Sequence, residues 1–449
     1  MAGRLPACAP DMFLPLLLPL AHRARAFLGV GVVLAVTLLL CSMAALAQSD
    51  KEKAARVSTA NGATFKQPAA SQHGPKRLGV RDGEAEARLI DIYKLAGQSK
   101  AREALAKAER LVQDHPNFQL AQLVYGDLLA AQARPLRTLG DVPENEAKAG
   151  ASALMELRLE SLMRLRALRE RPAVGTIPSQ FLALSPRNKH AIAVDASRAR
   201  LYLFENTETG LKLLADYYIS VGKSGTEKTI EGDSRTPLGI YFVTSNLDPR
   251  SLKDFYGSGA LPINYPNQLD VKRGKTGSGI WLHGTPPQQF ARAPLASDGC
   301  VVMANPDLKQ LLRKVQVGAT PVVTARSLQW ISPPQAEKEA QTFTSAITAW
   351  KDTRASGNEA QLKKFYLPDF QRSNKKTTEG ISVHDEVEYA QGKRVQFKDM
   401  SYLHWRDGDD TMVATFGEVF EGEKSGRTRR QYWLRQGSEW KLFHEEILG

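Results

Sequence analysis

Residues 281–303 read Trp-Leu-His-Gly-Thr-Pro-Pro-Gln-Gln-Phe-Ala-Arg-Ala-Pro-Leu-Ala-Ser-Asp-Gly-Cys-Val-Val-Met and hold the most specific pattern in the chain. In this stretch Cys300 follows His283 by 17 residues. A short apolar run leads into the histidine and another follows the cysteine, which predicts two short buried strands joined by a loop. A thiol and an imidazole on neighbouring loops are the minimum parts of a cysteine acyl-transfer site.

The first 47 residues have the pattern of an export signal. Arg23 and Arg25 precede an apolar run over residues 26–40, and Ala45-Leu46-Ala47 follows as a small-residue cleavage site. We therefore predict a signal peptide over residues 1–47 and a periplasmic location for the mature protein. The alternative is that the apolar run stays in place as an uncleaved inner-membrane anchor.

Cysteine usage supports a function for one thiol. The chain has three cysteines, and Cys8 and Cys41 both lie in the segment that export would remove. Cys300 would then be a lone thiol in an oxidising compartment, where it has no partner and is prone to oxidation. A thiol in that position is usually eliminated unless it has a role.

Charge and motif content limit the classes of partner. The formal net charge is +12, and the first 47 residues hold +2 of it, which leaves +10 on the mature chain. A basic surface favours anionic partners, but an exported protein is a poor fit to nucleic acid. We therefore expect solubility and attraction to an anionic cell envelope. No CxxC, HExxH or P-loop pattern occurs, so we expect no metal, no nucleotide and no other cofactor.

Length and composition predict several domains. A chain of 449 residues is too long for one ordinary core, and two to four domains are expected. Residues 48–80 are polar and small, as in a linker. We predict a helical module over residues 81–172, a mostly β domain over residues 186–327 and an α+β domain over residues 335–449.

The helical module begins with apolar residues at helical spacing between residues 84 and 133. Gly97 interrupts the pattern once, and His115-Pro116 interrupts it again, so three helices are expected. This arrangement resembles a tetratricopeptide-type hairpin, although too few units are present for a solenoid. Residues 144–170 predict one further long helix. We expect residues 84–171 to serve in packing, in dimerisation or in binding a protein partner.

Further along the chain, the apolar period changes to two near Asn188, as in strands. The mostly β domain is expected to include strands at 217–221, 239–244 and 321–324 and a helix at 306–315. Beyond it, Ser332-Pro333-Pro334 predicts a linker.

The last domain is expected to begin with a helix. Residues 337–357 predict a helix with Phe343, Ile347 and Trp350 on one face. The strands expected after it are 395–400, 412–420, 429–435 and 440–446. This order of elements resembles a nuclear transport factor 2-like domain.

Several ordered blocks of the mostly β domain resemble the L,D-transpeptidase (YkuD-type) catalytic domain. These blocks are Val221-Gly222-Lys223, the stretch 232–239, His283-Gly284-Thr285-Pro286, Ser297-Asp298-Gly299-Cys300 and Asn305. The resemblance spans about residues 190–325. It implies that Cys300 is the nucleophile and that His283 is the base and later the acid. It also implies that a backbone carbonyl near the cysteine loop orients the histidine ring.

The same resemblance, with general chemistry, suggests roles for neighbouring residues. Backbone N–H groups at Gly299 and Cys300 are expected to bind an oxyanion, and a nearby His⁺ is expected to lower the pKa of the thiol. The residues predicted to contact substrate are Ser297, Gly284, Thr285, Arg235, Asp298 and Arg292.

Two positions depart from the family pattern. Asp298 stands where His or Arg is usual, and Val302 stands where Arg is frequent. An acidic group near Cys300 should oppose formation of the thiolate. Arg292 and Arg235 are the candidates for the missing positive charge.

The resemblance implies peptidoglycan stem peptides as substrate and attack at the L,D bond that follows meso-diaminopimelate. The thioester would pass to an amine in a transpeptidase or to water in an L,D-carboxypeptidase. The order of domains resembles that of cell-shape peptidases that trim tetrapeptides to tripeptides, which favours hydrolysis. A third interpretation, favoured by Asp298 and Val302, is a non-catalytic cell-wall scaffold.

Overall fold

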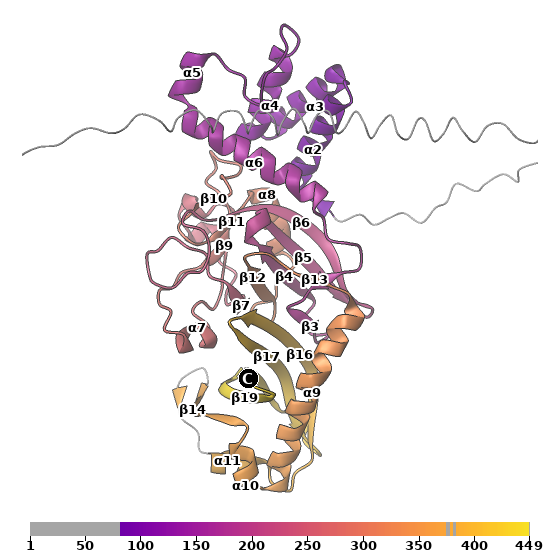
Figure 1. Cartoon of the computed structure of the whole chain (residues 1–449), viewed down its shortest axis with the longest axis vertical. Coiled ribbons are helices and arrows are strands. Elements are labelled where there is room, and N and C mark those ends of the chain that lie inside the picture. The colour runs from indigo at the N-terminus through magenta and orange to yellow at the C-terminus, as the bar shows by residue number, and fades with distance from the viewer. Residues whose placement is uncertain (1–80, 374–377, 380–382, 449) are drawn as a thin grey trace, which may run out of the picture. The chain divides into compact units, whose positions relative to one another are not determined.

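The computed structural model describes residues 81–373, 378–379 and 383–448. These residues form a helical region, a mostly β region and an α+β region in chain order (Figure 1), which confirms the predicted multidomain fold class. The predicted signal peptide and the linker up to residue 80 lie outside the described residues. Within the described part of the chain, none of the helices combines the length and apolar character needed to cross a membrane.

The helical module holds five helices, and its first three follow the pattern expected from the sequence. The helix expected over residues 144–170 is instead two helices, because Gly150 has non-helical dihedral angles and ends one while it precedes the other. Glycine has the lowest helix propensity after proline, so it is a frequent point of interruption. The helices are α2 (Glu84–Gly97), α3 (Ala101–Asp114), α4 (Gln119–Ala130), α5 (Glu144–Ala149) and α6 (Ala151–Arg169).

The mostly β domain is a mixed sheet that packs against a helix. Its strands follow the spatial order β7-β12-β4-β5-β6-β11-β9-β8. Two further strands, β10 and the short β1 (Arg81–Asp82), also pair with β6 but lie outside this order. The strands are β4 (His190–Asp195), β5 (Arg200–Thr207), β6 (Gly210–Gly222), β7 (Gly239–Phe242), β8 (Ala260–Pro262), β9 (Trp281–His283), β10 (Leu295–Ser297), β11 (Val301–Met303) and β12 (Pro321–Ala325). The helices are α7 (Gln268–Lys272) and α8 (Asn305–Leu312), and three 3-10 turns lie earlier in the chain at Ala196–Arg198, Pro249–Ser251 and Asp254–Tyr256.

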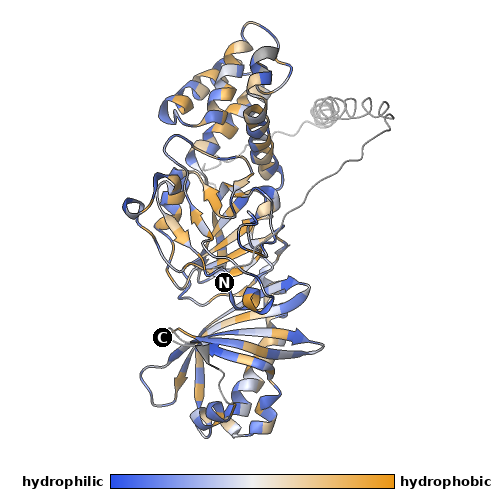
Figure 2. Cartoon of the chain, turned by 90° about the vertical axis from the view of Figure 1, so that its left-hand side faces the viewer, coloured by the Kyte–Doolittle hydropathy of each residue, from blue (hydrophilic) through white to orange (hydrophobic). Residues whose placement is uncertain are grey.

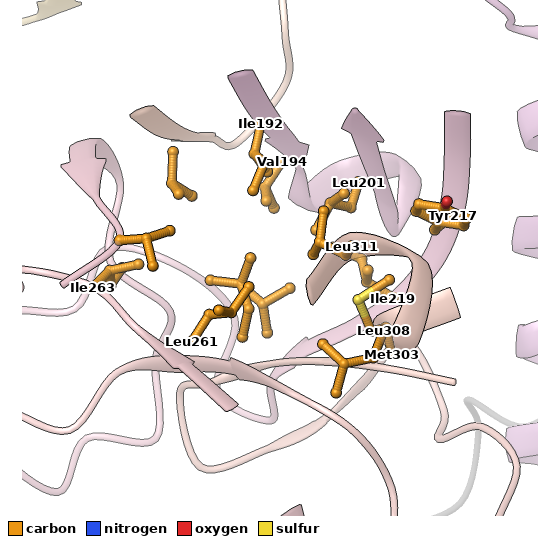
Figure 3. Close-up of a cluster of buried hydrophobic side chains, with 14 of the residues drawn as sticks. Ile192, Val194, Leu201, Tyr217, Ile219, Leu261, Ile263, Met303, Leu308 and Leu311 are labelled. Carbon is orange, nitrogen blue, oxygen red and sulfur yellow. The ribbon is translucent and has the colours of Figure 1, made fainter. Parts of the chain in front are cut away.

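The sheet of this domain is buried on both faces. Ile192 and Val194 of β4 point into a core with Leu308 and Leu311 of α8, as Figure 3 shows. Ala191 and Ala193, which alternate with these residues along β4, belong to a second core on the other face of the sheet. Strands that are buried on both faces carry apolar residues at nearly every position and not only at alternate ones. Figure 2 shows apolar residues gathered on these strands.

The C-terminal domain has helices packed on a mostly antiparallel sheet, in which one pair of strands is parallel. Phe343, Ile347 and Trp350 are buried on one face of its first helix, as predicted. The sheet order is β15-β14-β19-β18-β17-β16-β3. The elements are α9 (Pro333–Ser356), α10 (Glu359–Lys363), β14 (Tyr366–Ser373), β15 (Thr378–Glu379), α11 (Val383–Ala390), β16 (Val395–Asp407), β17 (Asp409–Phe420), β18 (Arg427–Gln436) and β19 (Glu439–Ile447). This is the helix-and-sheet arrangement that the nuclear transport factor 2-like resemblance implies.

Two features at the domain boundary differ from expectation. The linker predicted at Ser332-Pro333-Pro334 is wrong, because Pro333 begins α9 and Ser332 is its N-cap. Proline is well suited to the first helical position, where no backbone N–H bond is required. In addition, β3 (Phe181–Ala183) precedes the mostly β domain in sequence but pairs with β16. Nearby, β2 (Ile177–Pro178) pairs with β13 (Trp330–Ile331).

Candidate active site

The strands β9 and β11 bring the histidine and the cysteine together. They pair in parallel, with Leu282 opposite Val301 and His283 opposite Val302. Cys300 directly precedes β11, so it lies beside the start of β9, and its Sγ is 3.5 Å from the carbonyl oxygen of Gly279. The two short strands expected from the sequence are therefore adjacent, with Cys300 level with Trp281 and His283 two residues further along β9.

The geometry of His283 defines its protonation. The ring is buried, and Nδ1 lies 2.7 Å from the carbonyl oxygen of Gly284. A carbonyl only accepts hydrogen bonds, so Nδ1 carries the proton and Nε2 of the neutral ring does not. The orienting carbonyl belongs to the residue that follows His283 and not to the cysteine loop. Burial, with a smaller contribution from Arg292, lowers the pKa of His283 to about 4, so the ring is neutral at neutral pH.

The pKa of Cys300 moves in the opposite sense. Burial raises it, and Asp298 adds to this effect. The backbone N–H of Trp281 and the charges of Arg292 and Lys228 act against the rise without cancelling it. A thiol and a neutral imidazole are therefore the resting pair, and not the thiolate and His⁺ expected from the sequence, because burial disfavours both charged forms.

The cysteine loop is held by two hydroxyl groups. The Oγ of Ser297 donates to the Cys300 carbonyl at 2.6 Å and accepts from the Gly299 N–H at 3.1 Å. The Oγ1 of Thr236 donates to the Gly299 carbonyl at 2.8 Å. Gly299 has φ +122°, and a Cβ there would lie 2.7 Å from the Arg235 carbonyl oxygen, so only glycine fits. The Gly299 N–H is occupied in this arrangement and is not free for the predicted oxyanion.

Three of the predicted substrate contacts have other roles in the structure. The Arg235 guanidinium donates to the Thr226 carbonyl at 2.9 Å, inside its own loop. Thr285 is fully buried, and its hydroxyl donates to the Phe290 carbonyl at 3.3 Å. Gly284 permits close packing, because a Cβ at that position would collide with the side chain of Asn305.

Asn305 has a role that the sequence did not predict, although it stands in the family pattern. Its Oδ1 accepts from the Ser258 N–H at 2.8 Å, and its Nδ2 donates to the Thr285 carbonyl at 2.8 Å. The Gly284 N–H in turn donates to the Tyr256 carbonyl at 3.0 Å. Asn305 therefore fixes the turn after His283 against the loop that holds Tyr256. The ring of Tyr256 lies 5.1 Å from that of His283.

Arg292 is the cation beside the pair. Its guanidinium carbon lies 4.7 Å from the ring centroid of Phe255, and that ring lies 5.7 Å from the ring of His283. Arg292 interacts electrostatically with Cys300 and with Asp298 as well. Of the two candidates for the missing positive charge, the structure brings Arg292 to this position and uses Arg235 within its own loop.

Two lysines complete the charge around the thiol. Lys223 forms an ion pair of 2.7 Å with Asp298, which lowers the pKa of that exposed carboxyl and offsets its charge. Lys228 was not predicted from the sequence. It is buried, and its Nζ lies 2.8 Å from Asp233 and 2.9 Å from the Ile230 carbonyl. A lysine in a loop has no sequence signal that separates it from surface lysines.

In the part of the chain that the structure describes, no group of three or more His, Cys, Asp and Glu side chains is placed to hold a metal ion.

The architecture and this thiol–imidazole pair define a domain class. Residues 189–324 match the family model of the L,D-transpeptidase catalytic domain, YkuD. This match confirms the resemblance noted in the sequence. No curated protein matches the chain.

Solved structures are similar over a longer span. The structure of Bd1075 from Bdellovibrio bacteriovorus is 23% identical with a TM-score of 0.51, and the match covers 61% of this chain and 98% of that one. The helical cell shape determining protein Pgp2 from Campylobacter jejuni is 21% identical with a TM-score of 0.48, covering 60% of this chain and 95% of that one. The likeness to Bd1075 concerns the fold.

Proposed function

We propose that this protein is a cell-wall enzyme that cleaves the L,D bond of peptidoglycan stem tetrapeptides through a thioester on Cys300. The observation that carries the proposal is the pairing of β9 with β11, which puts Cys300 next to the strand that ends in His283, a ring whose Nε2 lacks a proton. The match of residues 189–324 to the L,D-transpeptidase domain family supports the substrate class.

The resting protonation states determine the first step. The sulfur of Cys300 attacks the carbonyl carbon on the L side of the bond while Nε2 of His283 takes the thiol proton. A C–S bond forms, and the carbonyl oxygen becomes an oxyanion that the backbone N–H of Cys300 and the charge of Arg292 stabilise. When the tetrahedral intermediate collapses, the C–N bond breaks, and the imidazolium returns the proton to the amine of the departing D-alanine.

The second half-reaction resolves the thioester. An acceptor amine or a water molecule gives a proton to Nε2 of His283 as it attacks the thioester carbon. The C–S bond breaks, and the sulfur recovers the proton as the thiol. Both acceptors use the same residues, so transpeptidation and carboxypeptidation share all of the machinery described above.

The deciding experiment is mass spectrometry of tetrapeptide muropeptides incubated with the purified protein, with Cys300→Ala as the matched control. Tripeptide without new cross-links would identify an L,D-carboxypeptidase. Cross-linked or amine-exchanged products would identify an L,D-transpeptidase. The absence of any product with the wild-type protein would refute the enzyme proposal and favour a cell-wall scaffold.

Periplasmic location is part of the same proposal, because peptidoglycan lies outside the inner membrane. It rests on the charged, apolar and small-residue blocks that end at Ala47. Sequencing the N-terminus of the protein recovered from the periplasm should begin at Gln48. An intact N-terminus in the membrane fraction would instead identify an anchor.

A further inference from the structure

The helical module is joined to the sheet of the catalytic domain by a buried cluster of charges. Glu86 of α2 lies 2.8 Å from Arg200 of β5 and 3.0 Å from Arg164 of α6. Arg164 also pairs with Glu160 at 2.7 Å, and Arg200 pairs with Asp216 of β6 at 2.5 Å. All five side chains are almost completely buried. Buried ion pairs are directional and costly to separate, so this cluster fixes the orientation of the module on the sheet.

A second contact joins the module to the loop between His283 and Cys300. The ring of Phe118, which precedes α4, stacks on Phe290 of this loop with 4.1 Å between centroids. The Phe290 N–H donates to the Asn117 carbonyl at 3.1 Å, and the Asn117 side chain donates to the Pro287 carbonyl at 2.9 Å. Both phenylalanine rings are buried. The turn between α3 and α4 is therefore the support on which this loop rests.

The supported loop carries Arg292, two residues beyond Phe290. The hydroxyl of Tyr218 donates to the Arg292 carbonyl at 2.8 Å, and the guanidinium of Arg164 lies 4.0 Å from the centroid of the Tyr218 ring. The main chain of Arg292 is thus fixed by two contacts. One is the hydrogen bond from Tyr218, which packs against the charge cluster, and the other is the stacking of Phe290 on Phe118. Its guanidinium rests on Phe255, next to the ring of His283.

We propose that the helical module is a working part of the catalytic apparatus, because Phe118 and Asn117 hold the loop that sets the Arg292 guanidinium beside Cys300 and His283. Phe118, Asn117 and Phe290 are positioning residues, and Arg292 is the group that acts. This inference rests on the proposed function, since it takes Cys300 as the nucleophile. It gives residues 84–171 a role in the reaction, beyond the packing or partner binding expected from the sequence.

The charges that act on the Cys300 sulfur are Arg292, Lys228 and Asp298, and His283 on the adjacent strand is neutral because burial lowers its pKa to about 4. Lys228 and Asp298 are held by Asp233 and Lys223, which do not touch the helical module in the described hydrogen bonds and ion pairs. Loss of the support at Phe290 should therefore affect Arg292 but not Lys228 or Asp298. Since Arg292 acts to lower the pKa of Cys300, the thiol should become harder to ionise.

The test is the rate of Cys300 alkylation by iodoacetamide as a function of pH. It uses the full-length protein as wild type, Phe118→Ala, Arg292→Gln and the double variant. We expect each single variant to move the rate profile to higher pH, and a profile displaced by one pH value means about a tenfold slower rate at fixed pH. The double variant should move no further than Arg292→Gln. A Phe118→Ala profile that stays in place, or a displacement that simply adds to that of Arg292→Gln, would overturn the inference.

Two further variants separate positioning from loss of structure. Leu89→Ala removes another buried side chain of the same module core, on α2, and should leave the profile unchanged because Leu89 makes none of the described hydrogen bonds or ring contacts to the loop of Arg292. If Phe118→Ala does not fold, Asn117→Ala replaces it, because it removes a single bond to the loop and should displace the profile in the same direction by less. An unchanged Asn117→Ala profile would then reject the inference.

The result is separable from the proposed function. Muropeptide turnover by the wild-type protein tests the reaction, whereas alkylation requires no substrate. If the alkylation profiles move as expected but no muropeptide is converted, the positioning role stands and the proposed reaction falls. If muropeptides are converted but the profiles do not move, the reaction stands and the positioning role falls.

Discussion

The catalytic domain meets its two neighbours through different chemistry. Toward the helical module it presents Arg200 and Asp216, which join a cluster of buried charges. Toward the C-terminal domain it presents an apolar face, where Phe204 and Phe242 share a core with Trp405 and other residues of that domain. Ion pairs also cross this second boundary, such as Lys272 with Asp369, but their carboxylates are exposed. Apolar contact stabilises in proportion to area and tolerates sliding, whereas ion pairs and hydrogen bonds fix direction. The boundary with buried ion pairs is the one that supports the loop bearing Arg292.

The largest effect is expected at the charged boundary. Arg200→Met leaves Glu86 and Asp216 buried without their shared cation, which should lower the free energy of unfolding by about 3–5 kcal/mol. Urea unfolding of the full chain measures this loss. Arg200→Lys keeps the charge and should lose less, and a Met variant as stable as wild type would contradict the contrast between the boundaries.

A comparable apolar change at the other boundary should separate stability from chemistry. Leu403 of β16 is buried in the core shared with the catalytic domain, so Leu403→Ala should cost about 2–4 kcal/mol in the free energy of unfolding. The pH profile of Cys300 alkylation should not move, because the boundary does not touch the loop of Arg292. A displaced profile would show that both boundaries position the site.

The charged boundary should also respond to pH. Burial raises the pKa of Asp307 in α8 to about 7, with a further contribution from Glu86. The folded protein therefore binds a proton that the unfolded chain, with a carboxyl pKa near 4, has released. Stability from this group is lost as the pH rises from about 4 to 7. Asp307→Asn should stabilise the protein by roughly 2 kcal/mol more at pH 8 than at pH 5 in urea unfolding. An equal effect at both values would contradict the raised pKa.

The smallest effect is expected at the exposed ion pair near the thiol. Lys223 and Asp298 are both largely exposed, so Lys223→Ala should change the free energy of unfolding by less than about 1 kcal/mol. It should also slow the alkylation of Cys300 slightly, because the charge of Asp298 is then less offset. A change as large as that of Arg292→Gln would show that the exposed pair, and not the supported loop, sets the charge at the site.

The local pattern of apolar residues was sufficient to predict the residues of the site but not their protonation state. The apolar residues around His283 and Cys300 predicted two short buried strands, and the structure pairs them. Periodicity likewise predicted the buried face of α9. The neutral state of the thiol and imidazole depends on burial by residues distant in sequence, which no local pattern contains.

Long-range contacts explain the remaining differences. Thr285 is polar and next to the catalytic motif, yet it is buried because Phe290 and Asn305 close over its turn. Phe290 had no special signal in the sequence, since its partner Phe118 stands in another domain. Proline at position 333 favours a linker when only the sequence is considered, but proline is equally compatible with the first turn of a helix.

The pairing of β3 with β16 has a consequence for synthesis on the ribosome. Phe181 lies opposite Leu403, which is 403 − 181 = 222 positions later in the chain. At about 5–20 residues per second, β3 must wait roughly 10–40 s before its neighbouring strand exists. The whole catalytic domain is made in that interval. The catalytic domain can therefore fold first and serve as the template on which the C-terminal sheet is completed.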